Sequence, residues 1–404
     1  MKVVIIGAGE QGYVLTWNLA KHPAVDEIVL GDWDVGRAEE VKAAWGAGKT
    51  TAVHVDARDF ERIAALAGGA DLILNAVIPE WDDPLMKAAL KARTHYLDMA
   101  TRVENGTIDD GYLLQVALDE QFKAIGRTAL IHTGMTPGVT NTLAAIGYED
   151  MERCEAIRIK AGSCFKSEVP IQVWSQETYF IDSQTPTLYF DNGEFLRAEP
   201  FAGWEYVDFP APVGRVAAVL HEHEECSTIP RYLGGKGLVH MDFKLAGGEE
   251  GMKKAKILVD SGIASPSPRT VRGQEVRPID VLVSCLPQSA PKEEIAKLAA
   301  EGRIVDEGAY LIELFEREGE LATETFWVFP PNIQKVTALI PGANRISYGT
   351  STPAAIYAGY LLDGTITQRG VLPPEALARD VRLKYVDDLK RAGLRIARRS
   401  TRWM

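Results

Sequence analysis

The first 34 residues constrain the fold of this chain more than any other stretch. A β-branched run, Lys2–Ile6, leads directly into the glycine-rich turn Gly7-Ala8-Gly9-Glu10-Gln11-Gly12. We predict a helix from Gln11 to His22, and a second apolar run, Glu27–Gly31, then ends at Asp32, twenty residues after the third glycine. A strand, a glycine turn, a helix and a second strand ending in an acid are typical of a dinucleotide-binding unit.

Each glycine of this turn has a separate physical task. Gly7 permits the tight turn, Gly9 lets a pyrophosphate approach the backbone, and Gly12 lets the helix pack close to its strand. The free N–H groups and the positive end of the helix dipole then face the phosphates. We therefore predict cofactor contacts from these glycines and from Glu10 and Gln11 between them.

Three further residues concern the adenosine half of the cofactor. Asp32 stands where a carboxylate accepts hydrogen bonds from both ribose hydroxyls, and it repels a 2′-phosphate, so NAD is favoured. Arg37 is placed either to flank the adenine or to meet that phosphate, which keeps NADP possible. Asp56 follows the third strand and suits either the adenine amino group or the cap of a helix that starts at Arg58.

The overall composition excludes several classes of protein. With 404 residues, 46% hydrophobic and 25% charged, the chain reads as a globular protein of more than one domain. A net charge of −12 argues against a nucleic-acid or anionic-membrane partner. No signal peptide, no apolar span of about twenty residues and no C-x-x-C pair is present. We expect a cytoplasmic protein with reduced thiols and small-molecule substrates.

Strands and helices continue to alternate after the first unit. The predicted strands are Thr51–Val55, Ala70–Val77, His95–Met99 and Thr128–His132, and the predicted helices are Val35–Trp45, Phe60–Ala67, Pro84–Ala92 and Asp109–Ala124. Six alternating strands predict a doubly wound parallel sheet. Ligands of such sheets bind at the carboxyl ends of the strands. Asn75, Ala76 and Pro79, at the end of strand four, are therefore predicted cofactor contacts.

The segment Gly134–Asn141 follows strand six. Its glycines, proline and threonines are typical of a turn that opens a helix. Because it lies at the carboxyl end of its strand, we expect it beside the nicotinamide, as active-site floor and domain hinge. Thr136 and Asn141 are the predicted substrate contacts there.

From Ala156 onward the pattern changes to that of an antiparallel sheet with helices on one side. The predicted strands are Ala156–Ala161, Thr187–Phe190, Arg215–Leu220, Val239–Lys244 and Phe326–Phe329, and the predicted helices are Trp174–Asp182, Gly251–Ser261, Lys292–Glu301 and Thr352–Asp363. Ser351 and Thr352 cap the last of these, with Pro353 in its first turn. The tail Leu377–Arg398 is predicted to be a helix packed on the first domain.

These elements predict an α/β protein in three parts. Residues 1–138 form a Rossmann dinucleotide-binding domain, residues 139–350 an α+β substrate domain, and residues 351–404 helices that return to the Rossmann domain.

The chain resembles the saccharopine dehydrogenase family, most closely its lysine 6-dehydrogenase-like branch. The resemblance rests on the Gly7–Gly12 turn, Val55-Asp56-Ala57, Tyr96-Leu97-Asp98, Gly134–Asn141 and Gly370-Val371-Leu372-Pro373-Pro374-Glu375. It implies a Rossmann domain, an inserted mixed-sheet domain that mediates homodimer formation, and C-terminal helices. It also implies NAD(P)-dependent redox chemistry at a C–N bond of an amino acid or polyamine precursor.

Oxidising an amine by hydride transfer requires the neutral amine. The corresponding ammonium group has an unperturbed pKa of about 10.4, so the amine is protonated near pH 7. The site therefore needs a base near neutrality or a desolvating pocket, and His132, His221 and His223 are the candidate bases. Asp98, Glu222 and Glu225 are candidates for holding the cation.

Each of these residues also has a plainer interpretation. A histidine at a strand end, such as His132, is often structural. His221 and His223 share one strand face and also fit metal ligation, although hydride transfer needs no metal and we predict none. The run from Glu222 to Glu225 is also compatible with a solvated charged surface.

Residues near this run are the predicted substrate contacts. His223, Glu225 and Arg231 lie where relatives contact substrate, and the acids suit an ammonium-bearing molecule better than a tricarboxylate such as saccharopine. Trp174 either walls the pocket or fills core.

The leading hypothesis is oxidation of an amine to an imine, as in lysine 6-dehydrogenase and lysine metabolism. The alternative is reductive coupling of the saccharopine or carboxynorspermidine dehydrogenase type. A third possibility is a non-catalytic NAD-sensing protein.

Overall fold

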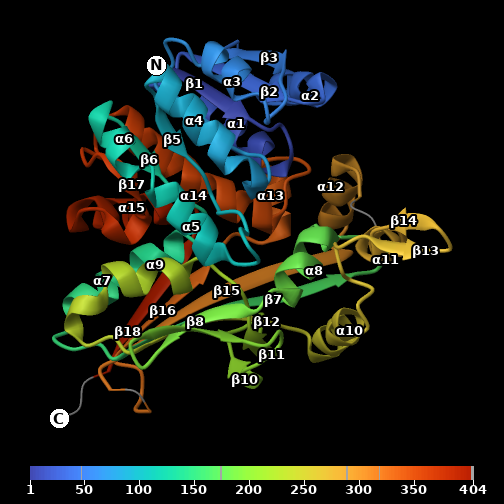
Figure 1. Cartoon of the computed structure of the whole chain (residues 1–404), viewed down its shortest axis with the longest axis vertical. Helices are drawn as coiled ribbons and strands as arrows, with labels where there is room; N and C mark the ends of the chain where they lie inside the picture. Colours follow the sequence, from blue (N-terminus) through green and yellow to red (C-terminus); the bar gives the residue numbers. More distant parts are fainter. Residues whose placement is uncertain (47, 173–174, 288–289, 318, 402–404) are drawn as a thin grey trace. The chain divides into compact units, whose positions relative to one another are not determined.

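A computed structural model describes residues 1–46, 48–172, 175–287, 290–317 and 319–401. The chain forms two compact units, which we describe separately (Figure 1). Unit 1 comprises Met1–Met151, Ser227–Leu233 and Ser347–Leu394. Unit 2 comprises Glu152–Cys226, Gly234–Ile346 and the residues from Arg395 onward. Trp174 lies outside the described residues.

Unit 1 contains a parallel sheet. Its strands are β1 (Lys2–Ile6), β2 (Glu27–Asp32), β3 (Thr50–His54), β4 (Leu72–Asn75), β5 (His95–Leu97), β6 (Thr128–Leu130) and β17 (Gly370–Leu372). In the described part of the chain they lie in the order β17-β6-β5-β4-β1-β2-β3. The predicted doubly wound sheet is confirmed, with β17 as an additional edge strand. Val3, Val4, Ile5 and Ile6 are at most 1% exposed, as expected of a strand buried on both faces.

The helices of unit 1 largely follow the sequence pattern. They are α1 (Glu10–Ala20), α2 (Val35–Trp45), α3 (Phe60–Leu66), α4 (Asp82–Ala92), α5 (Ile108–Val116), α6 (Asp119–Ala124), α7 (Val139–Asp150) and α15 (Arg379–Arg391), with the 3-10 turns η1 (Pro79–Trp81) and η3 (Pro374–Ala376). Helices α9 (Glu225–Tyr232) and α14 (Arg345–Leu362) each have residues in both units. The predicted single helix Asp109–Ala124 is two helices, so that prediction was wrong.

The cap of α3 differs from expectation. The helix begins at Phe60, and the side chain of Asp59 caps it by accepting a hydrogen bond from the backbone N–H of Arg62 at 2.9 Å. A cap at Asp56 is therefore wrong, because Asp59 is the acid immediately before the first helical residue.

Unit 2 contains a mixed sheet. Its strands are β7 (Ala156–Ser167), β8 (Thr187–Asp191), β9 (Glu194–Ala198), β10 (Glu205–Asp208), β11 (Arg215–Leu220), β12 (His240–Gly247), β15 (Ile304–Phe315), β16 (Glu324–Phe329) and β18 (Arg395–Ser400). In the described part of the chain the order is β10-β11-β12-β7-β15-β16-β18, and β8 pairs with both β12 and β9. The antiparallel sheet expected from the pattern is wrong at the parallel pair β12–β7, and the mixed sheet implied by the family resemblance is confirmed.

The longest pairing in unit 2 involves a strand that the sequence did not reveal. Strands β7 and β15 pair antiparallel over their whole length, from Ala156 opposite Phe315 to Ser167 opposite Ile304, and Figure 1 shows them side by side. The buried residues of β15 do not alternate regularly with exposed ones. A simple period of two therefore misses it.

Helices cover part of this sheet. They are α8 (Gln176–Gln184), α10 (Glu249–Asp260), α11 (Pro278–Cys285), α12 (Lys292–Ala300) and α13 (Ile333–Leu339), accompanied by the 3-10 turn η2 (Gly234–Lys236) and the hairpin β13 (Arg269–Val271) and β14 (Gln274–Val276). Phe180 of α8, Met252 of α10 and Ile279 of α11 share one apolar cluster with Ala217 and Val219 of β11. The expectation of helices packed on the sheet thus holds for these three.

The C-terminal segment corrects two predictions. The expected helical tail Leu377–Arg398 is α15 followed by strand β18, which pairs antiparallel with β16 in the sheet of unit 2. Arg398 and Arg399 of β18 lie over the rings of Phe326 and Trp327, with 5.1 Å between each guanidinium carbon and the ring centroid. Pro353 lies inside α14 rather than in its first turn, because the helix already begins at Arg345.

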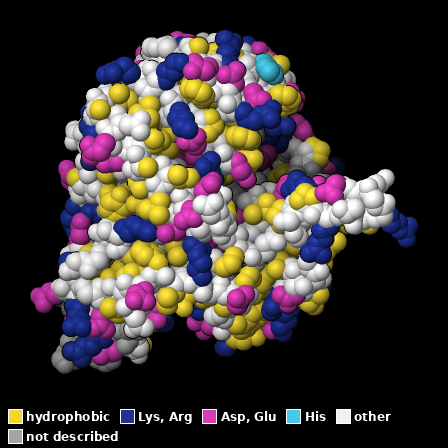
Figure 2. Space-filling model, in the orientation of Figure 1, with side chains coloured by type: hydrophobic (Ala, Val, Ile, Leu, Met, Phe, Trp, Pro, Cys, Tyr) yellow, Lys and Arg dark blue, Asp and Glu magenta, His cyan; other side chains and the backbone are white. Residues whose placement is uncertain are grey.

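The helices and the surface charges can be compared with the expectation of no membrane or nucleic-acid partner. No helix among the described residues combines the length and apolar character that a membrane crossing requires. On the face drawn in Figure 2, lysine and arginine side chains are interspersed with aspartate and glutamate.

Candidate active site

The glycine turn of unit 1 has the shape of a phosphate cradle. Gly7 has a φ of +108°, and a Cβ there would lie 2.5 Å from the carbonyl oxygen of Ala76. A Cβ on Gly12 would lie 1.9 Å from the carbonyl oxygen of Gly7, whereas one on Gly9 would meet no atom within 4 Å. The outer glycines are thus required by close packing and the middle one faces open space, as the pyrophosphate of a dinucleotide needs.

The helix after the turn presents its N-terminus at this position. Gly9 is the N-cap of α1, and no side chain caps it. Glu10 is exposed in the first turn. The side chain of Gln11 is held by a contact within unit 1, because its Oε1 accepts a hydrogen bond from Ser351 Oγ at 2.5 Å. The uncapped backbone N–H groups remain suited to an anion.

Asp32 is fixed beside the turn. Its carboxylate is 8% exposed, and Oδ2 accepts a hydrogen bond from the backbone N–H of Ala8 at 2.6 Å. Oδ1 accepts one from the backbone N–H of Asp34 at 2.8 Å. A carboxylate oxygen accepts more than one hydrogen bond, so this orientation leaves lone pairs for ribose hydroxyls.

The other predicted adenosine contacts lie on the surface. Arg37 is exposed in the first turn of α2. Asp56 forms an ion pair with Arg58, with 2.9 Å from Arg58 Nε to Oδ1 and 2.5 Å from Nη2 to Oδ2. Hydrogen bonding to the Arg58 side chain lowers the pKa of Asp56 to about 2. A contact of either residue with adenine or phosphate remains a prediction.

The end of strand β4 is polar and buried. Asn75 is 3% exposed; its Oδ1 accepts from the backbone N–H of Val77 at 3.0 Å, and its Nδ2 donates to Asp82 Oδ1 at 2.7 Å. Ala76 is buried against the glycine turn, and Pro79 is half-buried at the start of η1. The side chain of Asn75 thus holds the backbone after β4, where Ala76 contacts Gly7 of the glycine turn.

Asp98 and His132, which were predicted separately as cation holder and base, lie in contact with each other. Asp98 Oδ1 accepts a hydrogen bond from the backbone N–H of His132 at 2.8 Å. Gln115 bridges the pair: its Nε2 donates to Asp98 Oδ2 at 2.8 Å, and its Oε1 lies 3.2 Å from His132 Nε2. His132 is fully buried and has a φ of +60°, which is uncommon for a residue other than glycine. The geometry shows His132 as part of a buried network.

The turn after strand β6 is held by a second buried network. Asn141 Oδ1 accepts from the backbone N–H of Gly138 at 2.8 Å, and its Nδ2 donates to Thr228 Oγ1 at 3.2 Å and to Glu375 Oε1 at 3.1 Å. Asn141, Thr228 and Glu375 are each at most 4% exposed. Thr136, in contrast, is half-buried. Asn141 therefore orients the turn, and Thr136 is the more accessible of the two predicted substrate contacts.

Two of these residues were missed by the sequence analysis. Gln115 lies within a helix with nothing in its spacing to single it out. Glu375 ends the Gly370–Glu375 motif, so a signal was present, but its contact with Asn141 crosses 234 positions of sequence.

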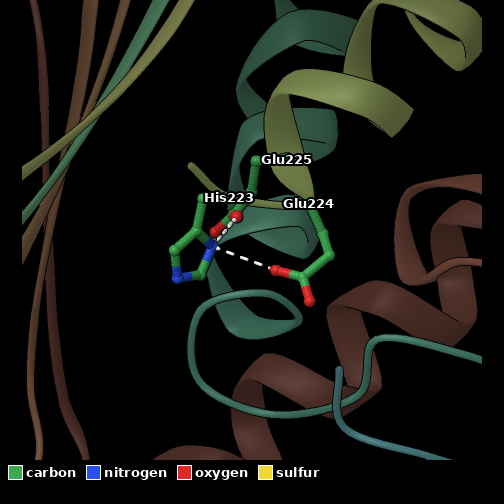
Figure 3. A group of neighbouring side chains, drawn as sticks. All are labelled: His223, Glu224 and Glu225. Carbon is green, nitrogen blue, oxygen red and sulfur yellow. Dashed lines mark hydrogen bonds and ion pairs between the residues drawn. The ribbon is translucent and has the colours of Figure 1, made fainter. Parts of the chain in front are cut away.

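In unit 2, His223, Glu224 and Glu225 point toward one another (Figure 3). His223 Nδ1 lies 2.5 Å from Glu225 Oε2 and 3.3 Å from Glu224 Oε2. Burial alone lowers the pKa of His223, but Glu225, Glu224 and Asp182 together raise it to about 9. These side chains offer ligand atoms within 4.8 Å of one another, so the same group is a candidate metal site.

His221, in contrast to His223, is neutral. Burial, followed by the charge of His223, lowers the pKa of His221 to about 3, so the ring is neutral near pH 7. It lines a small pocket together with Tyr179, Asp182 and Ser183. The loop thus carries a neutral and a protonated imidazole two residues apart, and the protonated ring of His223 is able to donate a proton.

Glu222 binds the backbone of β8, and Arg231 forms a side-chain ion pair. Glu222 is 2% exposed, and its Oε2 accepts from the backbone N–H of Leu188 in β8 at 2.5 Å, while Oε1 lies 3.7 Å from Arg197 Nη1. Within unit 1, Arg231 pairs with both carboxylate oxygens of Asp109, at 2.8 and 3.1 Å. The predicted catalytic and substrate roles of these two side chains remain predictions.

Comparison with known families identifies both parts of the chain. Residues 3–130 match the model of the saccharopine dehydrogenase NADP binding domain, and residues 134–394 match the model of the saccharopine dehydrogenase C-terminal domain.

Individual proteins extend this comparison. Carboxyaminopropylagmatine dehydrogenase from Synechocystis sp. is 24% identical over 392 residues, which cover 94% of this chain and 93% of that protein. Carboxynorspermidine synthase from Vibrio cholerae is 25% identical over 307 residues, or 71% of this chain and 73% of that protein.

Two solved structures share the fold. Saccharopine dehydrogenase (L-Glu forming) from Saccharomyces cerevisiae aligns with a TM-score of 0.71 and 12% identity, covering 99% of this chain and 100% of that one. Homospermidine synthase from Legionella pneumophila, in complex with NAD, aligns with a TM-score of 0.68 and 13% identity, covering 100% and 92%.

Proposed function

Because this chain belongs to the saccharopine dehydrogenase family and its cofactor is NAD(P), we propose that it reduces the imine formed between an amine and an aldehyde. The observation that carries the proposal is the similarity, over 94% of this chain, to carboxyaminopropylagmatine dehydrogenase. Carboxynorspermidine synthase supports the same chemistry. These relatives favour reductive coupling over the lysine 6-dehydrogenase-like oxidation that the sequence analysis ranked first.

The names of both relatives suggest the substrate class. Each enzyme name contains the name of a compound in which a carboxyl-bearing chain is attached to an amine such as agmatine or norspermidine. Disconnecting such a product at its secondary C–N bond gives a primary amine and an aldehyde that carries a carboxyl and an amino group. We therefore propose an amino-acid semialdehyde and a diamine or agmatine as substrates.

The reaction has two stages. The amine nitrogen attacks the aldehyde carbon, and loss of water leaves the imine. A hydride then adds to the imine carbon and a proton to its nitrogen, which gives the secondary amine. When bound, NAD(P)H supplies the hydride.

The side chains of each unit suit separate parts of this chemistry. In unit 1, the Gly7–Gly12 turn and Asp32 are suited to hold the cofactor, and Asn141 orients the turn after β6. In unit 2, His221 is neutral but, with a pKa of about 3, too weakly basic to take a proton from an ammonium group. Protonated His223 is suited to give one when water leaves. Glu224 and Glu225 favour a cationic substrate.

The test is a product assay. The purified protein is incubated with NADH or NADPH, an amino-acid semialdehyde and each of agmatine, 1,3-diaminopropane, putrescine and lysine. Coupling predicts cofactor oxidation only when both partners are present. It also predicts a product whose mass is that of amine plus aldehyde plus two hydrogens minus water. A second assay contains NAD⁺ and lysine alone, and reduction of NAD⁺ there would favour amine oxidation over coupling. Cofactor binding without turnover in either assay would favour a sensor.

Gly9→Asp provides a matched loss-of-cofactor control. The new Cβ meets no atom within 4 Å, so the fold is retained, while the carboxylate repels a pyrophosphate. Gly251→Asp, on α10 of unit 2, is the companion variant because its Cβ is equally free. Turnover that persists in Gly9→Asp would contradict the cofactor assignment.

A further inference from the structure

A buried polar group lies at the carboxyl ends of β5 and β6 and takes no part in the proton transfers proposed for unit 2. Asp98 and His132 follow these strands, and Gln115 reaches them from α5; each is at most 4% exposed. Polar side chains this enclosed need hydrogen bonds to offset their burial. Because none of the three is open to solvent, any influence on the reaction passes through the backbone segment that they hold.

The amide of Gln115 has one orientation that satisfies both of its neighbours. An ionised carboxylate accepts hydrogen bonds and cannot donate them, so Gln115 directs its NH₂ group to Asp98, with 2.8 Å from Nε2 to Oδ2. The amide oxygen then faces His132 Nε2 at 3.2 Å. Because that oxygen can only accept, His132 Nε2 carries the proton, and the ring is the Nε2–H tautomer.

Asp98 also fixes the backbone at the start of the turn that follows β6. Its Oδ1 accepts from the backbone N–H of His132 at 2.8 Å, and its carbonyl oxygen accepts from the N–H and the hydroxyl of Thr133 at 3.1 and 2.5 Å. The φ of +60° at His132 is a left-handed conformation that persists only where the surroundings impose it. Asp98 holds this backbone, and Gln115 holds the ring.

The turn itself is closed and cannot absorb a shift of its first residue. Gly138 has a φ of +133°, and a Cβ there would lie 2.2 Å from the carbonyl oxygen of Gly134. The same carbonyl accepts from the N–H of Val139 at 3.1 Å, and Asn141 Oδ1 accepts from the N–H of Gly138 at 2.8 Å. A displacement of His132 therefore moves the turn as one body.

We propose that Asp98 and Gln115 are positioning residues, which lock the tautomer and the backbone of His132 and so set the turn against the nicotinamide ring. This inference rests on the proposed function, because the turn lies at the carboxyl end of β6, where the nicotinamide is expected. Hydride transfer requires close and aligned reacting carbons, so a displaced turn slows the transfer more than it weakens binding.

Asp98→Asn tests the lock with a change that keeps the shape of the side chain. The new amide still accepts from the His132 N–H through its oxygen, so its NH₂ group faces Gln115. The Gln115 amide then turns over, and its Nε2 donates to His132 Nε2, which drives the ring to the Nδ1–H tautomer. The contact of Gln115 Nε2 with Asp82 Oδ2, at 3.4 Å, is too long to prevent this.

Two measurements need no turnover. Long-range ¹H–¹⁵N NMR should show Nε2–H for His132 in the wild type and Nδ1–H in Asp98→Asn. The fluorescence of bound NADH, which depends on the surroundings of the nicotinamide, should change in the same variant, whereas AMP should bind as to the wild type. Asp387→Asn, the same substitution in an exposed ion pair of α15, should match the wild type throughout. An unchanged tautomer or unchanged NADH fluorescence in Asp98→Asn would overturn the proposal.

Kinetics separate positioning from folding. In the coupling assay, Asp98→Asn should lower kcat by about tenfold, while KM for the amine stays within about twofold. Gln115→Met, which keeps the length of the side chain but removes both hydrogen bonds, should do the same. Loss of AMP binding in step with kcat would indicate a damaged fold and overturn the assignment. A wild type inactive in coupling would refute the proposed function alone, because the NMR and NADH measurements require no substrate.

Discussion

The Glu225 carboxylate lies 2.5 Å from Nδ1 of His223, and it contributes most to keeping that imidazole protonated. Burial favours the neutral ring, so the raised pKa of about 9 reflects the pull of Glu225, then Glu224 and Asp182. His221, two residues earlier, has no such carboxylate among the causes of its shift and is neutral. Two histidines separated by one residue on the same loop thus hold opposite protonation states.

Replacing Glu225 should lower the pKa of His223. We expect Glu225→Gln to bring it down by at least one unit, because the strongest charge that holds the proton is lost. Glu224→Gln should have a smaller effect, because Glu224 lies 3.3 Å away. Titration of the histidine NMR signals measures both. An equal pKa in Glu225→Gln and wild type would contradict the assignment.

The same pair should make stability depend on alkaline pH. In the unfolded chain His223 titrates near 6.5, and in the folded protein near 9. Its stabilising contribution is therefore complete below about pH 6.5 and is lost as the pH rises through 9. For each unit by which Glu225→Gln lowers the pKa of His223, we expect the wild type to lose about 1.4 kcal/mol more than the variant over this interval. Urea unfolding at pH 6.5, 8 and 9.5 tests this, and parallel curves would refute it.

Gln115 should be essential for the Asp98–His132 network. Gln115→Leu removes the donor to Asp98 Oδ2 and the partner of His132 Nε2, leaving buried polar atoms with fewer bonds. We expect a loss of roughly 2–3 kcal/mol in the free energy of unfolding. Gln121→Leu, at an exposed position of α6, is the control and should change stability little. A similar small effect for both variants would show that the network is not stabilising.

How well the sequence predicts this protein depends on the range of the interactions. Strand β1 and the Gly7–Gly12 turn were predictable because apolar runs and glycine spacing are local. Strands β17 and β18 were not, because short segments become strands only by pairing with distant partners: Gly370 with Thr128, and Arg398 with Phe326. A helical pattern was therefore extended through β18.

In the candidate site, too, local patterns were predictable and contacts between distant segments were not. Asp98 and His132 were predictable from strand ends, since parallel strands place their carboxyl ends together. The partners that fix their geometry were not predictable, because Gln115 and Glu375 act through contacts between elements that no periodicity records. The charge states of His221 and His223 also required the structure, since both share the same local sequence and differ only in which carboxylates approach them.

Asp32 should set both the affinity for NAD(P) and the choice between its two forms. We expect Asp32→Ala to weaken NADH binding, because the acceptor for the ribose hydroxyls is lost, and to reduce discrimination against NADPH, because the repelling charge is gone. Measured dissociation constants for both cofactors test this. Asp34→Ala removes only the α2 cap and should leave their ratio unchanged. Unchanged affinity of Asp32→Ala for both cofactors would remove Asp32 from the site.

Asn141 should be sensitive to a single added charge. Asn141→Asp keeps the shape of the side chain but places a second carboxylate where the amide donates to Glu375 Oε1 at 3.1 Å. Two carboxylates this close and this buried cannot both ionise cheaply, so one pKa rises. We expect a loss of roughly 2–4 kcal/mol at pH 7, part of which returns near pH 5 as one carboxylate takes up a proton.

The measurement for Asn141→Asp is thermal unfolding at pH 5, 6 and 7, beside Gln274→Glu, the same amide-to-carboxylate change at an exposed position of β14, as the control. The variant should be more destabilised at pH 7 than at pH 5, whereas the control should follow the wild type at every pH. Because Asn141 Oδ1 also accepts from the backbone N–H of Gly138, a charge at this position should also disturb the turn that opens α7. A destabilisation independent of pH would show that the lost amide donor, not repulsion by Glu375, accounts for the effect.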